Sequence, residues 1–184
     1  EIRFRTAALE AIAYERSLFA IQEGNWLDLR DLEVPGTAVS DSQPALMTAW
    51  CHGAPGIGLA RLLSLPYIDD AKIRSEINTA LKTTINQGFG HNHSLCHGDL
   101  GNLELLLQAS LTLDDPQWKT QVDRLAAAIL EGINQHGWLC GVPLGVETPG
   151  LMTGLAGIGY ELLRLAAPEI VPSVLGLEPP KVNK

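Results

Sequence analysis

The chain has 184 residues, of which 46% are hydrophobic and 5% are aromatic, and it carries a formal net charge of −8. This length and apolar content allow one domain with a buried core and exclude a disordered chain. The charges form no basic stripe, and no apolar run reaches the roughly 18 residues that a membrane span needs, so we expect neither a nucleic-acid partner nor a membrane span. The three cysteines show no spacing typical of a disulfide framework, which favours a cytoplasmic location.

Apolar residues recur every three to four positions from residue 3 to about residue 23. This spacing predicts an amphipathic helix whose apolar face carries Ala7, Leu9, Ala11, Ile12, Tyr14, Leu18 and Ile21. Gly, Pro, Asp and Ser residues dominate residues 24–44, which predicts a long loop. A short helix is then expected from residues 43–45 to about residue 50.

Five more helices are expected after this point, at residues 57–65, 67–88, 102–113, 114–137 and 151–168. The first, third and fifth of these are strongly apolar, whereas the second and fourth are amphipathic and end at Gly88 and Gly137. The tail beyond Pro168 is rich in proline, and we expect it to be irregular.

A small-residue turn precedes each of the three apolar helices, and the three turns align with one another. The sequences HGAPGI at 52–57, HGDLGN at 97–102 and TGLAGI at 153–158 occupy equivalent positions. Each unit is therefore a turn, an inner helix and, in the first two, a solvent-facing helix. The sequence predicts an all-α fold of helical hairpins whose turns lie at one end.

Two of the turns begin with a cysteine and a histidine. If the repeats stack, Cys51 and Cys96 lie at equivalent places, and His97 supplies a third soft ligand. Two thiolates and an imidazole suit zinc and leave one tetrahedral position open, as in catalytic zinc sites. Cys140 is the rival fourth ligand, but it lies outside the repeated turns. From spacing alone, two buried cysteines that happen to recur explain the pattern equally well.

The stretches WCHGAPGIG, NHSLCHGDLGN and PGLMTGLAGIGYELLRLA together resemble the lanthionine synthetase C-like family, most of all the C-terminal cyclase domain of class II lanthipeptide synthetases. The resemblance covers about residues 45–167. The resemblance implies an α/α-barrel, of which residues 1–184 form a C-terminal part, with a zinc held by Cys51, Cys96 and His97. It implies a peptide cyclase that adds a cysteine thiolate to dehydroalanine or dehydrobutyrine in a dehydrated precursor peptide, which would be its partner.

The resemblance leaves the general acid unassigned. The family's catalytic His and Asp lie upstream of the first zinc cysteine, but residues 1–50 contain no histidine, and Met47 stands where the family often has Arg. His52 is the candidate catalytic residue, either as a proton donor or in orienting the substrate; alternatively, it only shapes the turn. We expect the chain to continue an upstream synthetase region, and to bind zinc but cyclise peptide poorly on its own.

Two other functions stay open. One is a module of the same fold that binds zinc and a thiol without closing rings. The other is a metal-free glycosidase, which would need paired carboxylates at the turns, where the sequence offers Asp99 alone. We expect Asp99 to cap the helix that follows it, and His91 and His93 to be exposed loop residues.

Overall fold

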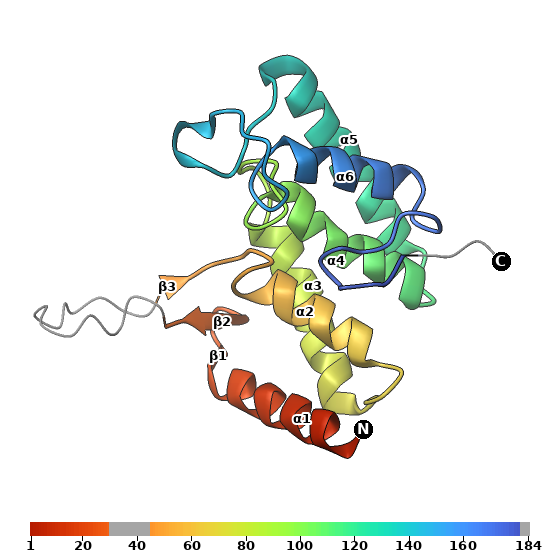
Figure 1. Cartoon of the computed structure of the whole chain (residues 1–184). Helices are drawn as coiled ribbons and strands as arrows, with labels where there is room; N and C mark the ends of the chain where they lie inside the picture. The colour runs from red at the N-terminus through yellow and green to blue at the C-terminus, as the bar shows by residue number, and fades with distance from the viewer. Residues whose placement is uncertain (30–44, 181–184) are drawn as a thin grey trace, which may run out of the picture.

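The computed structural model describes residues 1–29 and 45–180. In these residues the chain forms six α-helices (Figure 1): α1 (Ile2–Ser17), α2 (Ala54–Ser64), α3 (Ala71–Gln87), α4 (Asp99–Thr112), α5 (Gln117–His136) and α6 (Leu155–Ala166). A single 3-10 turn follows α5 at Pro143–Gly145. The expected all-α class is confirmed, and the five helices expected after residue 50 all form. No helix of the described residues is long and apolar enough to cross a membrane.

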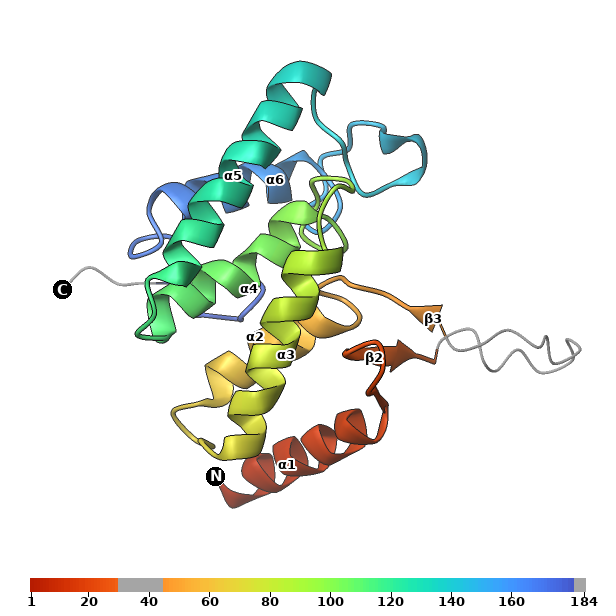
Figure 2. The same ribbon diagram turned by 180° about the vertical axis from the view of Figure 1, so that it is seen from behind.

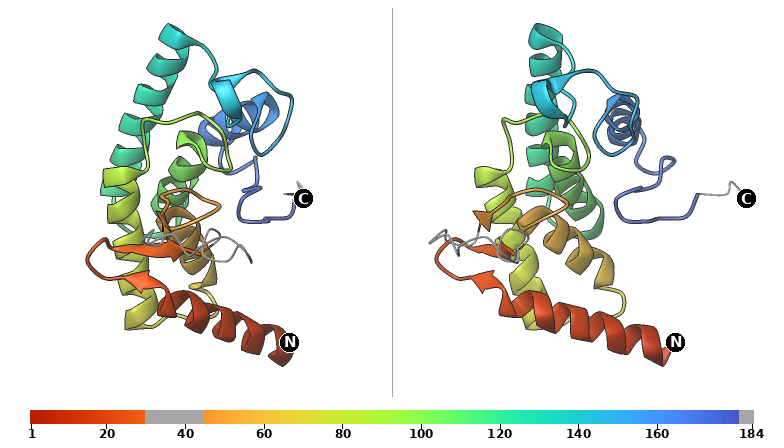
Figure 3. Two further views of the ribbon diagram at one scale, coloured as in Figure 1. Left: turned by 90° about the vertical axis from the view of Figure 1, so that its left-hand side faces the viewer. Right: turned by 60° about the vertical axis from the view of Figure 1, so that its left-hand side comes forward.

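The helices after α1 form two layers, with α2, α4 and α6 on one side and α3 and α5 on the other (Figures 2 and 3). Helix α4 lies at the centre and packs against α2, α5 and α6. Every residue of α4 from Asp99 to Ala109 is buried, including the polar Asp99, Asn102, Glu104 and Gln108. The alternation of an inner and an outer helix is the arrangement that the repeat predicted.

A small antiparallel sheet links α1 to the first turn. Its strands are β1 (Phe19–Ala20), β2 (Asn25–Asp28) and β3 (Ala45–Leu46), in the order β1-β2-β3. The expected helix from residues 43–45 to 50 is therefore wrong, and residues 43 and 44 lie outside the described part. Such a short segment cannot stabilise a helix by itself, and its backbone instead pairs with β2 and, at Ala49, with His52.

Helix α1 ends at Ser17 instead of residue 23, and its predicted apolar face is not buried. Of that face only Ile12 is buried, and Tyr14 remains 61% exposed. Charged side chains contact the rest of the molecule instead: Arg61 of α2 forms an ion pair with Glu15, with 2.8 Å between Nη2 and the carboxylate oxygen Oε2. The spacing of apolar residues predicted the helix, but it did not predict which side chains join the helix to the rest of the molecule.

Candidate metal centre

Glycines let each inner helix begin close to the chain that leads into it. A Cβ atom on Gly56 would lie 2.0 Å from the carbonyl oxygen of Trp50. The equivalent Gly101 and Gly157 would each place a Cβ 1.8 Å from the carbonyl oxygen six residues earlier. Any side chain would clash with backbone here. The repeated glycines thus fold all three turns in the same way.

Backbone hydrogen bonds join the three turns at equivalent residues. The Cys51 amide donates to the Cys96 carbonyl at 3.1 Å, and the Cys96 amide donates to the Met152 carbonyl at 2.8 Å. The alignment of the three turns in the sequence is thereby an alignment in space. Cys51 and Cys96 are adjacent for this reason.

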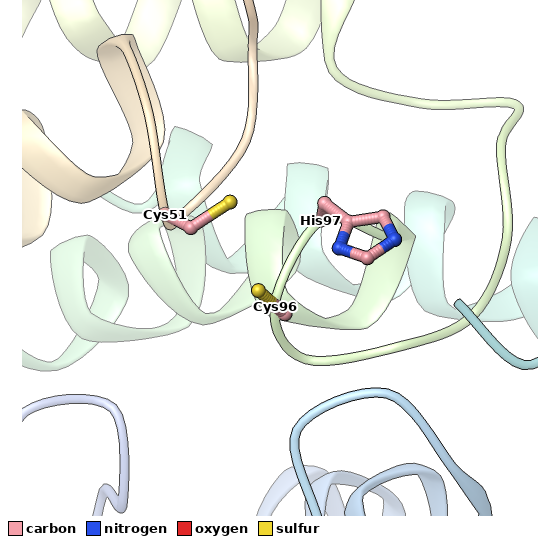
Figure 4. Close-up of side chains that lie close together, drawn as sticks. All are labelled: Cys51, Cys96 and His97. Carbon is pink, nitrogen blue, oxygen red and sulfur yellow. The ribbon is translucent and has the colours of Figure 1, made fainter. Parts of the chain in front are cut away.

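The two cysteines and His97 point toward one another (Figure 4). One ligand atom from each of Cys51, Cys96 and His97 lies within 4.8 Å of the other two, and all three residues are half-buried. In a tetrahedral zinc site such atoms are roughly 3.5–3.8 Å apart, as follows from Zn–S and Zn–N bond lengths of about 2.3 and 2.0 Å. The group therefore fits zinc after a small contraction. It supplies three ligands of a possible four.

One further feature of the turns suits anionic metal ligands. Each cysteine lies two residues before the N-cap of an inner helix, Gly53 for α2 and Gly98 for α4. Helix N-termini carry a partial positive charge that favours thiolates. Cys140 is buried and lies outside the group that Cys51, Cys96 and His97 form.

Asp99 and His93 hold the loop before Cys96, in roles that differ from those expected from the sequence. The Asp99 carboxylate accepts from the amides of Gly90 and His91 at 3.1 and 3.0 Å, and α4 has no side-chain cap. His93 is buried instead of exposed, and its Nδ1 accepts from the Leu139 amide at 3.0 Å. Burial lowers the pKa of His93, with the Asp99 charge opposing the shift. His91 is exposed, as expected.

His52 lines a cavity of about 750 Å³, and Cys51 lines the same cavity. Apolar residues dominate its walls, among them Leu18, Trp26, Trp50, Ile57, Leu63 and Leu175. The Nδ1 atom of His52 is 3.6 Å from Oδ1 of the buried Asp28. No motif in the sequence marks Asp28, which strand β2 brings to this place.

The repeated turns and the group of Cys51, Cys96 and His97 define a helical-hairpin protein with a candidate zinc site at the end where the turns meet. Residues 1–176 match the family model of the lanthionine synthetase C-like proteins, and the chain belongs to this family. It is also similar to the lacticin 481/lactococcin biosynthesis protein LcnDR2 of Lactococcus lactis subsp. lactis, with 30% identity over 128 residues. That match covers 62% of this chain and 14% of the relative.

Proposed function

We propose that this chain is part of a zinc-dependent peptide cyclase that closes thioether rings in a dehydrated precursor peptide. The convergence of Cys51, Cys96 and His97 at one end of the repeated turns carries the proposal. Membership of the lanthionine synthetase C-like family and the name of the lacticin relative support it. The same comparison supports continuity with a larger synthetase, because the match covers a small part of the relative. We place the reaction in the cytoplasm.

Cys51, Cys96 and His97 would hold the zinc and leave one position for the substrate. The bound metal would stabilise the thiolate of a substrate cysteine, the nucleophile of the reaction. The apolar cavity beside Cys51 would bind the part of the peptide around the substrate cysteine and exclude water from its thiolate. The chain thus supplies both a ligand set and an adjacent binding space.

Ring closure adds the substrate S–H across the carbon–carbon double bond of dehydroalanine or dehydrobutyrine. A C–S bond forms at the β-carbon and a proton reaches the α-carbon, so the ring has the same mass as the linear peptide. We propose His52 as the group that delivers this proton, because it lines the cavity next to Cys51. Asp28 at 3.6 Å would orient its imidazole.

Thiol alkylation followed by mass spectrometry tests the proposal. A free cysteine takes up the alkylating agent, whereas a thioether does not. The substrate is a dehydrated peptide that contains cysteine. With the full-length protein encoded by the whole gene, we expect the alkylatable thiol of the peptide to be lost in a zinc-dependent way. With residues 1–184 alone, we expect little loss. The loss should disappear in Cys96→Ala and persist in Cys140→Ala.

The same assay separates the cyclase from a module that only binds zinc and a thiol. A module would retain zinc and the peptide thiol, yet every cysteine would remain alkylatable once the peptide is released by denaturation. That outcome with the form encoded by the whole gene would refute the cyclase proposal.

A further inference from the structure

A buried hydroxyl without a hydrogen-bond partner lies beside the candidate ligand His97. Ser94 is fully buried, and its Oγ atom has no partner in the described part of the chain. Leaving a buried hydroxyl unpaired costs about 1–3 kcal/mol. Such an atom next to a candidate metal ligand is a candidate partner for that ligand.

Gly141 shows where the two side chains approach each other. A Cβ atom on Gly141 would lie 2.4 Å from Ser94 Oγ and 2.9 Å from His97 Nε2. Both atoms therefore border the same small space, which exists only because residue 141 has no side chain. The Gly141 amide donates to the Thr153 carbonyl at 2.7 Å, which fixes this wall of the space to the third turn.

The His97 ring directs one nitrogen toward the two sulfur atoms and the other away from them (Figure 4). In the ring as drawn, the nitrogen next to the carbon that joins the ring to the backbone, Nδ1, is the one nearer the two sulfur atoms. Nε2, on the far side of the ring, is the nitrogen that borders Gly141. A histidine that binds a metal through one nitrogen almost always donates the N–H of the other to a fixed acceptor, which sets the ring orientation. Asp99, the carboxylate of this loop, is already engaged with two backbone amides.

We propose that Ser94 Oγ accepts a hydrogen bond from His97 Nε2 when a metal is bound at Nδ1, and that Gly141 keeps the space for this bond open. Ser94 and Gly141 are then positioning residues for the ligand. The inference rests on the zinc site of the proposed function, and it accounts for the unpaired hydroxyl.

The test compares zinc affinity with the stability of the zinc-free chain. Zinc dissociation constants are measured by competition with a chromophoric chelator, and unfolding free energies of the zinc-free proteins by urea titration. Ser94→Ala should weaken zinc binding by about 10- to 100-fold without lowering zinc-free stability, because it removes only an unpaired hydroxyl. Gly141→Ala should also weaken binding, since its methyl group displaces the imidazole.

Thr84→Val is the matched control, because Thr84 Oγ1, in α3, is another buried hydroxyl that has no partner among residues 1–29 and 45–180. Its zinc affinity should equal that of the wild type. The cobalt-substituted proteins give a spectroscopic check: Ser94→Ala should shift the visible absorption bands of the metal, and Thr84→Val should not.

Equal zinc affinity in Ser94→Ala and the wild type would overturn this inference and leave the zinc site standing. A loss of zinc-free stability with unchanged affinity would overturn it too, because Ser94 would then have a purely structural role. A wild-type chain that binds no zinc would overturn both the site and the inference.

Discussion

Two carboxyl groups lie fully buried between α4 and α6. Arg164 donates from Nε to Glu104 Oε2 at 2.7 Å and from Nη1 to the Val171 carbonyl at 2.7 Å. Glu161 is fully buried beside this pair. Burial raises the pKa of Glu161 well above its ordinary value, and the neighbouring Glu104 charge acts in the same direction, with Arg164 opposing. Glu161 is therefore protonated in the folded protein at a pH where the unfolded chain has lost that proton.

This proton makes stability fall as the pH rises. Stability is full below the ordinary glutamate pKa and is lost as the pH climbs toward the raised pKa, with a slope of about 1.4 kcal/mol per pH unit in between. Glu161→Gln keeps a neutral side chain of the same shape, so its unfolding free energy should lack this slope. Urea unfolding from about pH 5 to about pH 8 measures the difference.

Glu104→Gln is the matched variant for this experiment. It removes the nearest carboxylate partner of the buried Arg164 and should cost about 3–5 kcal/mol. Because the Glu104 charge raises the pKa of Glu161, stability should also depend less on pH in this variant. The account of Glu161 fails if Glu161→Gln and the wild type show the same dependence of stability on pH.

For single residues, the sequence analysis identified those that a repeated motif marks. It did not identify those whose role depends on which residues pack around them. The candidate ligands Cys51, Cys96 and His97 stand in aligned turns, and the structure brings them together. Ser94 lies within the stretch NHSLCHGDLGN, but nothing there marks the serine, because the space beside its Oγ atom is bordered by the distant Gly141. Asp28 belongs to no motif. An apolar period likewise does not reveal which charged side chains will be paired inside the core.

The inner helices depend on glycines whose roles differ within one helix. In α6, Gly157 is buried, and a Cβ atom there would lie 1.8 Å from the Leu151 carbonyl oxygen. Gly159, two residues later, is exposed and has nothing within 4 Å of such an atom. Only the first of these glycines is required by the turn.

Gly157→Ala and Gly159→Ala should therefore change stability in opposite directions. The first should lower the unfolding free energy by about 1–3 kcal/mol or more, because the methyl group meets backbone that cannot move aside. The second should raise it by about 0.5–1 kcal/mol, since alanine favours the helix over glycine. Urea unfolding of both proteins measures the two effects, and equal losses would show that the close approach in the turn has no energetic weight.

The helices were predictable where a long period coincided with an end signal. Asp70 caps α3 by accepting from the amides of Lys72 and Ile73 at 2.9 and 2.8 Å, and Gly88 ends it. The segment before the first turn was mispredicted because local propensity favoured a helix, whereas pairing with β2 decided the outcome. Such pairing joins residues far apart in the chain and leaves no local signal.

In the whole molecule, the three turns lie together at one end of the helical layers. Backbone hydrogen bonds from the Cys51 amide to the Cys96 carbonyl and from the Cys96 amide to the Met152 carbonyl hold them together. The repeat in the sequence predicted this arrangement, because equivalent units that stack bring equivalent residues side by side. The cavity beside Cys51 could not be predicted, since its walls come from α1, α2, β2 and the C-terminal tail. The site is therefore a product of the repeat, and its surroundings are a product of the tertiary fold.

Zinc content of the purified chain tests the central claim most directly. Elemental analysis should find about one zinc per chain in the wild type and in Cys140→Ala, and none in the Cys51→Ala, Cys96→Ala double variant, because two of three ligands are then absent. Unchanged zinc in the double variant would contradict the assigned site. A loss of zinc in Cys140→Ala as complete as in Cys96→Ala would mean that the site is closed by a fourth protein ligand, which contradicts an open position for substrate.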